Sequence, residues 1–426
     1  METFLPIRLF LSYVFLVFSS LSTTLLSPIV SYSFVYILIS LLYILFCKTI
    51  LKYASPAGRF LVLIITGLVL RLVLIPIHPI GSDDFYRYLW DGKVIANGIN
   101  PYRYSPSDPA LTGLHSQILP ARVNFADMKT IYPPLAEILF YLAYRISGEN
   151  FLGIKLLLFV FDIMTLFGIF MIVRKLNLSR KNILLYALCP LPLFQFFVDG
   201  HMDGFGLPLL VFGILFYITD KKLLSYFLIG LSICIKPLAL IVIPIFVFSE
   251  RGMLNRLKVV TVPIAVCVLL YLPFLFSGSP FQALITFTEN WTFNGVVFDL
   301  LNSFLNDNQR TRAVCALLLL VLYAPIVLSR KELLTKIYLS VFLLMIFSPV
   351  VHPWYLSWLA ILLPLHPRWS GIAFVSLISL TSFTLVTYQL TGVWKDYLAV
   401  LLFEYVPVLS MFLYEIAVPL PIVPRQ

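Results

Sequence analysis

Apolar runs long enough to cross a membrane recur along the whole chain, and they constrain its fold more than any other feature. A helix needs about 20 consecutive apolar residues to span the hydrocarbon core. With 60% hydrophobic and 12% charged residues and a mean hydropathy of +0.97, the composition excludes a soluble domain. We expect spans at residues 6–28, 31–50, 59–79, 151–173, 182–198, 204–219, 258–276, 312–329, 335–350, 353–366, 371–390 and 398–418.

A further apolar stretch, residues 223–249, contains Lys236-Pro237. Because proline cannot donate a hydrogen bond to the helix ladder, we expect two short helices with the break between them. The sequence therefore predicts an all-α polytopic membrane protein with about 12–14 transmembrane helices.

The net charge of +10 does not indicate a nucleic-acid partner, because the basic residues gather in short loops on one side of the predicted bundle. The positive-inside bias makes those loops cytoplasmic. Both termini are then cytoplasmic, and residues 80–150 form a large first extracytoplasmic loop. The basic residues are Lys48, Lys52, Arg59, Arg174, Lys175, Arg180, Lys181, Lys221, Lys222, Arg251, Arg256, Lys258, Arg330, Lys331 and Lys336. The other outer loops are 199–203, 277–311, 351–353 and 391–397.

Two interfacial helices are expected in the first outer loop. One covers Phe85–Ile95, and the other covers Pro133–Ile146, whose apolar residues share one helical face. If the second were a span instead, the basic loop 174–181 would lie outside, against the charge bias. We therefore expect both helices to lie along the membrane surface.

Asp83 and Asp84 open this outer loop, directly after a predicted span. Carboxylates at a membrane edge are costly unless they face water or have a function. They could simply cap the following helix through their side-chain oxygens. Alternatively, one of them is a general base that takes a proton from an acceptor hydroxyl; a capping carboxylate could serve both roles. Asp91, about two turns further on, could bind acceptor hydroxyls or be solvated.

Three basic residues are candidates for binding a phosphate on the outer face. Arg87 and Arg103 lie in the first outer loop, and arginine binds phosphate well, although contact with anionic lipid is an alternative for each. Lys236 lies in an apolar stretch, where an ionisable residue suggests a function. Lys236 could neutralise a lipid-linked phosphate, or it could snorkel or pair with a structural aspartate.

A short outer loop has the sequence Asp199-Gly200-His201-Met202-Asp203. Its acidic and histidine spacing could suggest metal ligands, but no second cluster accompanies it. We favour contacts of His201 and Asp203 with a sugar, a phosphate or the first outer loop. The five cysteines show no disulfide or zinc spacing either, and we predict neither a metal nor a cofactor.

The segment Val351-His352-Pro353-Trp354-Tyr355 is richer in polar and aromatic residues than an interfacial belt requires. Its rings could stack on a sugar, so His352, Trp354 and Tyr355 are candidate substrate-binding residues. In contrast, Arg71 and Asp162 lie at similar depths on two predicted spans. Their opposite charges predict a structural ion pair.

Five short motifs follow one another along the chain, and they are Asp83-Asp84-Phe85-Tyr86, Gly98-Ile99-Asn100-Pro101-Tyr102, Tyr132-Pro133-Pro134-Leu135-Ala136, Lys236-Pro237 and His352-Pro353-Trp354-Tyr355. In this order the chain resembles the GT-C superfamily of integral-membrane glycosyltransferases, and within it bacterial polyprenol-phosphate-mannose-dependent mannosyltransferases. It is more distantly similar to the first mannosyltransferase of glycolipid-anchor assembly. The resemblance implies an inverting transfer with a loop aspartate as base, no nucleotide site, and two horizontal helices in the first outer loop. It also places Tyr102 and Tyr132 among the substrate-binding candidates.

The chain departs from the GT-C pattern at its start, where two predicted spans precede the helix that normally comes first. We therefore expect residues 1–58 to be an extra transmembrane hairpin. Residues 59–276 would form the catalytic module, and residues 277–426 a C-terminal region whose outer loops contribute to the site. The acidic pair leaves the identity of the base open; Asp84 is preferred because it directly precedes the Phe-Tyr pair, with Asp83 second.

These observations favour a glycosyltransferase that moves a sugar, mannose by resemblance, from a polyprenyl-phosphate donor to a hydroxyl acceptor on the extracytoplasmic side of a bacterial inner membrane. The partners are then this donor, an unidentified acceptor and membrane lipids. A transporter or flippase of a lipid-linked sugar is the alternative, but it predicts broken helices in both halves, and the sequence predicts one broken pair. An acyl- or phosphate-transferring enzyme centred on His201 or His352 is a second alternative.

Overall fold

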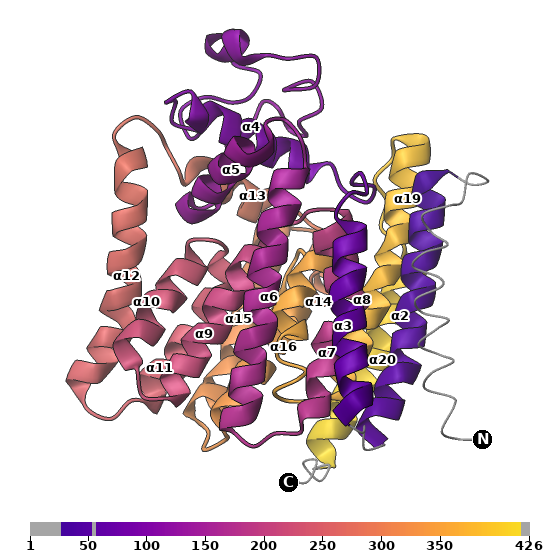
Figure 1. Cartoon of the computed structure of the whole chain (residues 1–426). Helices are drawn as coiled ribbons and strands as arrows, with labels where there is room; N and C mark the ends of the chain where they lie inside the picture. Colours follow the sequence, from indigo (N-terminus) through magenta and orange to yellow (C-terminus); the bar gives the residue numbers. More distant parts are fainter. Residues whose placement is uncertain (1–26, 53–56, 419–426) are drawn as a thin grey trace.

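The computed structural model describes residues 27–52 and 57–418, and these residues form a helical bundle with a cap over one end (Figure 1). Apart from its last two positions, the expected span at 6–28 lies outside the described residues. Within them the ordered backbone is helical, and Phe293 and Val350 form an isolated bridge. The all-α class is confirmed.

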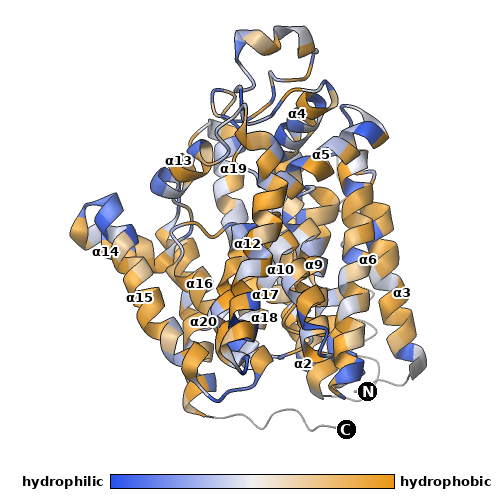
Figure 2. Cartoon of the chain, turned by 90° about the vertical axis from the view of Figure 1, so that its left-hand side faces the viewer, coloured by the Kyte–Doolittle hydropathy of each residue, from blue (hydrophilic) through white to orange (hydrophobic). Residues whose placement is uncertain are grey.

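Seven helical segments of the described chain are long and apolar enough to cross a membrane, namely Pro28–Leu51, Leu152–Lys175, Arg180–Val198, Met253–Leu275, Asn308–Leu328, Trp369–Thr391 and Leu398–Ala417. Five shorter apolar helices accompany them, namely Met202–Ile218, Lys222–Ile233, Pro237–Ser249, Val296–Leu305 and Leu333–Phe347. Apolar residues cover the bundle, whereas hydrophilic residues concentrate in the cap and in the turns at the other end (Figure 2). This distribution is the one expected of a protein whose bundle lies in a bilayer.

The helices of the bundle are α2 (Pro28–Lys52), α3 (Ala57–Leu74), α6 (Leu152–Lys175), α7 (Leu184–Ala187), α8 (Pro190–Pro192), α9 (Gly206–Ile218), α10 (Lys222–Ile233), α11 (Ile243–Ser249), α12 (Met253–Leu275), α14 (Val296–Leu305), α15 (Asn308–Leu328), α16 (Leu333–Phe347), α17 (Ser357–Ala360), α18 (Trp369–Leu377), α19 (Ser382–Thr391) and α20 (Leu398–Ala417). Short 3₁₀ turns lie at Pro109–Leu114, Arg180–Ile183, Met202–Phe205, Pro237–Val242, Pro353–Leu356 and Ile378–Thr381, and a π turn lies at Leu193–Val198.

The cap contains α4 (Asp84–Ala96), α5 (Pro134–Ser147) and α13 (Gln282–Asn290), and α4 and α5 lie across the end of the bundle (Figure 1). The two helices expected in the first outer loop are thereby confirmed, with ends shifted by one residue. They pack closely, because a Cβ on Gly92 of α4 would come within 2.3 Å of the Phe140 carbonyl oxygen of α5. The cap is therefore a tightly packed layer.

The span predicted at 353–366 is wrong. After the turn at Pro353–Leu356, α17 contains four residues, and irregular backbone follows up to Pro367. Trp358, Leu359 and Ile361 are fully buried in the protein. Hydropathy cannot distinguish a segment surrounded by other helices from one surrounded by lipid, and prolines prevent a continuous helix here.

Two other predicted spans differ in shape from the expectation. The span at 182–198 consists of α7, α8 and the π turn, because Pro190 and Pro192 interrupt the helix ladder. The span at 59–79 ends at Leu74, shortly before Pro76, which disfavours helical backbone at the residue that precedes it. The break predicted within 223–249 is confirmed, since α10 ends at Ile233 and the next helical turn begins at Pro237.

The predicted ion pair between Arg71 and Asp162 is confirmed and joins α3 to α6. Arg71 Nε donates to Asp162 Oδ2 at 2.6 Å, and both side chains are buried. The other oxygen of Asp162 accepts from the Tyr186 hydroxyl at 2.6 Å, and Arg71 Nη1 donates to the Ala187 carbonyl at 2.6 Å. A buried pair needs such additional hydrogen bonds to offset desolvation, so this network is a structural joint of three helices.

Candidate functional site

The start of α4 is fixed to the bundle by the short loop 199–203. Asp199 Oδ1 accepts from the Gly81 N–H at 2.7 Å, and Asp199 Oδ2 accepts from the Tyr32 hydroxyl at 2.5 Å. One carboxylate thus links α2, the loop after α8 and the entrance to α4. The residues directly after Gly81 are consequently held in place relative to the transmembrane helices.

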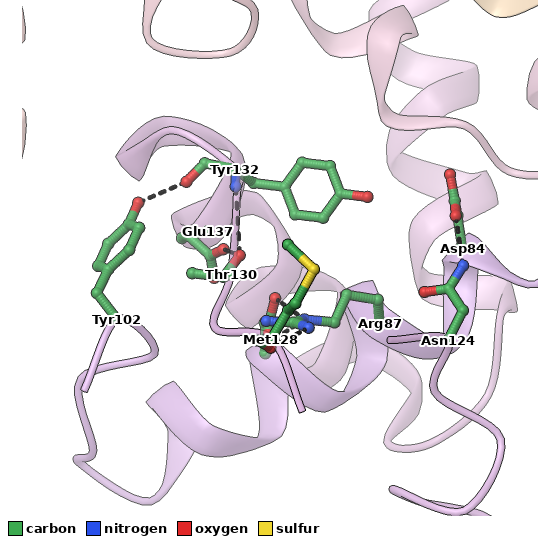
Figure 3. A network of polar contacts seen from close by, with 9 residues as sticks. Asp84, Arg87, Tyr102, Asn124, Met128, Thr130, Tyr132 and Glu137 are labelled. Atoms are coloured by element: carbon green, nitrogen blue, oxygen red, sulfur yellow. Dashed lines mark hydrogen bonds and ion pairs between the residues drawn. The ribbon is translucent and has the colours of Figure 1, made fainter. Parts of the chain in front are cut away.

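Asp83 and Asp84 are the first acidic residues after this attachment point. The Asp83 side chain makes no capping hydrogen bond; instead the Ser82 hydroxyl accepts from the Asp84 N–H at 3.2 Å. Asp83 is exposed, whereas the Asp84 side chain is 24% exposed. Asn124, from the long loop between α4 and α5, donates to Asp83 Oδ1 at 3.0 Å. It also donates to Asp84 Oδ1 at 2.8 Å (Figure 3). The two carboxylates share one amide donor, which leaves Asp84 Oδ2 available.

The surroundings of Asp84 make it a better base than an ordinary aspartate. Burial raises the pKa of Asp84 to about 6, and the negative charge of Asp83 adds to this rise. The Asn124 hydrogen bond and the positive charge of Lys236 oppose it. At neutral pH the carboxylate is then mostly ionised but has a pKa close to the working pH, which is the condition that suits a general base.

Lys236 lies at the helix break and reaches this region. Lys236 Nζ is 3.1 Å from Asp203 Oδ2 and 4.0 Å from the centre of the Tyr355 ring. Asp203 is held in turn by the indole N–H of Trp358, which donates to its Oδ1 at 3.0 Å. An ammonium group has three donors, so the pair with Asp203 leaves Lys236 able to bind another acceptor.

His201 approaches Asp84 from the loop before α9. Gly200 makes this possible, because its φ of +80° lies in the left-handed region that residues with a side chain rarely adopt. His201 Nδ1 is 3.7 Å from Asp84 Oδ2, and the imidazole stacks on Trp354 with 3.6 Å between ring centres. Burial lowers the pKa of His201 well below its usual value, and electrostatic interactions with His352 and Lys236 lower it further. The imidazole is therefore neutral at pH 7.

The structure brings together eight of the residues predicted for the site, namely Asp83, Asp84, His201, Asp203, Lys236, His352, Trp354 and Tyr355. His352 also stacks on the Trp354 ring, with 4.3 Å between the two ring centres. The residues come from three separate outer segments and the helix break. Asp199 instead accepts hydrogen bonds from Tyr32 of α2 and from Gly81 before α4. Asp199 and Asp203 therefore do not point to a common ligand position. Among the described residues, no three His, Cys, Asp or Glu side chains are positioned to hold a metal ion together.

Of the other predicted residues, Arg87, Tyr102 and Tyr132 belong to a polar network inside the cap (Figure 3). Arg87 Nε donates to both oxygens of Asp91, at 3.0 and 2.9 Å. The Tyr102 hydroxyl donates to the Tyr132 carbonyl at 2.6 Å, and the ring of Tyr132 points from the network toward Asp84 (Figure 3). Arg103 is exposed, with its guanidinium 5.0 Å from the ring centre of Tyr104. Arg87 and Asp91 are thus each other's partners, and Arg103 lies at the surface of the cap.

Three residues at the site were missed by sequence reasoning. Asn124 lies in a long loop without regular periodicity, so nothing in the pattern distinguishes it. Trp358 and Phe293 read as ordinary apolar residues of a span and of an interfacial belt. Their contacts with Asp203 and His352 join segments far apart in the chain, and no local signal reports such contacts.

Asp84, Lys236 and the aromatic rings thus gather where a bundle of helices long and apolar enough to span a membrane meets its polar cap. The chain belongs to the alpha-(1->6)-mannopyranosyltransferase family: the model of the family's N-terminal domain matches residues 15–250, and the model of the MptB C-terminal domain matches residues 292–414. The expected resemblance to membrane mannosyltransferases is confirmed by these matches.

Among solved structures, the chain is similar to an Archaeoglobus fulgidus oligosaccharyltransferase tethered to an acceptor peptide, with a TM-score of 0.39 and 13% sequence identity. That similarity covers 84% of this chain and 54% of the oligosaccharyltransferase, so the chain spans about half the length of that protein. A search of curated proteins finds no significant match.

Proposed function

We propose that this protein transfers mannose from a polyprenyl-phosphate donor to a hydroxyl acceptor, with inversion at the anomeric carbon and with Asp84 as the general base. The observation that carries the proposal is the position of Asp84, which is partly exposed, has a pKa of about 6 and lies beside Lys236 and His201. The acceptor hydroxyl would give its proton to Asp84 while its oxygen attacks the anomeric carbon, and the lipid phosphate would leave with the bonding electrons.

Lys236 would stabilise the leaving phosphate, because negative charge develops there in the transition state. Its pair with Asp203 holds the ammonium beside the site, and its remaining donors would meet the phosphate. The Trp354 and Tyr355 rings, with His352, would contact the sugar. Arg87 is engaged with Asp91, so we propose that it keeps the shape of the cap, as do Tyr102 and Tyr132. Arg103 would attract anions at the surface.

The linkage named in the family description restricts the donor. That family is described as alpha-(1->6)-mannopyranosyltransferases, enzymes that add a mannopyranosyl group through an alpha-(1->6) bond. A single displacement inverts the anomeric carbon, so an alpha product requires a beta-linked sugar phosphate. We therefore propose a beta-linked polyprenyl-phosphate mannose as the donor.

We further propose that the site faces the extracytoplasmic side of a bacterial inner membrane, with cytoplasmic termini. The basic residues Arg174 and Lys175 end α6, whereas the cap lies at its start. A helix of 24 residues is about 36 Å long, so these charges are separated from Asp84 by roughly the thickness of the bilayer. Residues 59–276 would carry the catalytic groups, and residues 277–426 would add His352, Trp354 and Tyr355.

The test uses membranes that contain the protein and are supplied with radiolabelled polyprenyl-phosphate mannose or glucose. Native protein should move label from the mannose lipid into another product. Asp84→Asn should lower this rate by about 10²–10⁴-fold, the usual contribution of a general base. Asp307→Asn is the matched control, because Asp307 caps α15 by accepting from the Arg310 N–H, and asparagine caps a helix equally well.

Two results would contradict the proposal. If Asp84→Asn transfers as fast as the native protein, Asp84 is not the base. If the native protein consumes neither lipid-linked sugar, the donor class is wrong, and transport of such a lipid should be measured instead.

A further inference from the structure

The imidazole of His201 has unused hydrogen-bonding groups inside the protein. The residue is 1% exposed, yet among the described residues neither Nδ1 nor Nε2 has a hydrogen-bond partner. A neutral imidazole carries one donor and one acceptor, and buried polar groups are nearly always paired. An unpaired group beside a candidate active site is therefore expected to have a partner that arrives with the substrate.

The distance from His201 to Asp84 defines where that partner would lie. His201 Nδ1 and Asp84 Oδ2 are 3.7 Å apart, which is too far for a direct hydrogen bond. It is less than the sum of two hydrogen-bond lengths, each about 2.8 Å. The separation of the two atoms therefore matches a single oxygen atom hydrogen-bonded to both.

His201 cannot turn away to find another partner, because it is the first ring of a stack. The imidazole lies on Trp354, at 3.6 Å between ring centres and 19° between planes. Trp354 lies on His352 at 4.3 Å and 5°, and His352 lies on Phe293 at 4.7 Å and 26°. We call these four residues the ring column; it fixes the plane of the imidazole.

The far end of the ring column is attached to the bundle. The Phe293 N–H donates to the Pro349 carbonyl at 3.0 Å, and the Phe293 carbonyl accepts from the Val351 N–H at 2.8 Å. The next residue, Asn294, donates to both oxygens of Glu404 on α20, at 3.2 and 3.1 Å. The column is thus held between α20 and Asp84.

We propose that the reacting hydroxyl of the acceptor lies between Asp84 and His201, donating its proton to Asp84 Oδ2 and accepting a hydrogen bond from His201 Nδ1–H. This inference rests on the proposed function. As the oxygen attacks, its proton passes to Asp84, the new carbon–oxygen bond forms, and the bond to the lipid phosphate breaks with its electrons on the phosphate. His201 stays neutral throughout and determines which lone pair faces the anomeric carbon. The ring column positions the imidazole for this contact.

Two substitutions separate hydrogen bonding from packing. His201→Phe keeps a ring to stack on Trp354 and removes both nitrogens, whereas His201→Asn loses the ring and keeps an N–H donor in the position of Nδ1. The probe is beta-linked radiolabelled polyprenyl-phosphate mannose in membranes with their own acceptors. Thermal unfolding of the detergent-purified proteins is measured in parallel.

The two variants should rank in opposite orders in transfer rate and in thermal stability. Transfer should fall about 10- to 100-fold in His201→Phe, since a partner of a buried polar group is lost, and it should be partly retained in His201→Asn. Thermal stability should equal or exceed the native value in His201→Phe, because an unpaired buried polar group is removed, and it should fall in His201→Asn. A residue that only fills space would give the same order in both measurements.

The inference is overturned if His201→Phe transfers within twofold of native, or at least as fast as His201→Asn. Asp84→Asn distinguishes this failure from that of the proposed function. If Asp84→Asn is inactive while His201→Phe is fully active, only the role of His201 is wrong. If Asp84→Asn is as active as native, the proposed function itself is wrong.

Discussion

At the scale of single residues, the environment of Asp84 determines how its activity should depend on pH. A general base must be ionised, so kcat/KM for transfer should fall as the pH drops through about 6, the pKa of Asp84. The charge of Asp83 raises this pKa, and the Asn124 hydrogen bond lowers it. Asp83→Asn should therefore move the acid limb of the profile to lower pH, and Asn124→Ala should move it to higher pH.

The measurement is the pH dependence of label transfer from polyprenyl-phosphate mannose in membranes, for the native protein and both variants. Opposite shifts are required, because one change removes a negative charge and the other removes a donor. If Asp83→Asn abolishes transfer at every pH, Asp83 rather than Asp84 is the base. If the acid limbs of both variants coincide with the native limb, the titrating group is neither Asp83 nor Asp84.

At the scale of elements, the packing of α4 against α5 should control the site, since α4 begins at Asp84. A Cβ on Gly92 would lie 2.3 Å from the Phe140 carbonyl oxygen, so Gly92→Ala must push the two helices apart. We expect a loss of about 1–3 kcal/mol in the free energy of unfolding, the usual cost of overpacking, together with slower transfer.

Gly113→Ala is the matched control for this change, because nothing lies within 4 Å of the position that its Cβ would take. Thermal unfolding in detergent and label transfer are measured for both variants. Equal stability of Gly92→Ala and Gly113→Ala would show that α4 and α5 are not in close contact.

The elements also show how far the sequence determines this structure. Hydropathy predicted most spans, and Lys236-Pro237 predicted the break that brings Lys236 beside Asp203. Hydropathy failed at residues 353–366, because burial in protein and burial in lipid favour the same apolar residues. Asp84, Lys236 and His352, which the structure brings together, were singled out because charged or polar residues beside a membrane span are conspicuous. Asn124, Trp358 and Phe293 were not, because their roles depend on contacts between distant segments.

At the scale of the whole molecule, the proposed function requires that the cap and the basic loops lie on opposite sides of the membrane. Gln117 is exposed in the cap, and Asn255 is exposed in the first turn of α12, at the other end of the bundle (Figure 1). Gln117→Cys and Asn255→Cys change no charge, so they leave the bias that orients the chain intact. In intact cells, a membrane-impermeant maleimide should label Gln117→Cys strongly, and it should label Asn255→Cys after the membrane is opened.

The native chain is the background control for this experiment. Its five cysteines form no disulfide, and all are buried except Cys267, which is partly exposed on α12. If Gln117→Cys is labelled only in opened cells, then Asp84 faces the cytoplasm, because the cap and Asp84 are joined through Asn124 and the start of α4. The acceptor would then have to be cytoplasmic, and an extracytoplasmic mannosyl transfer would be excluded even if the chemistry of Asp84 were correct.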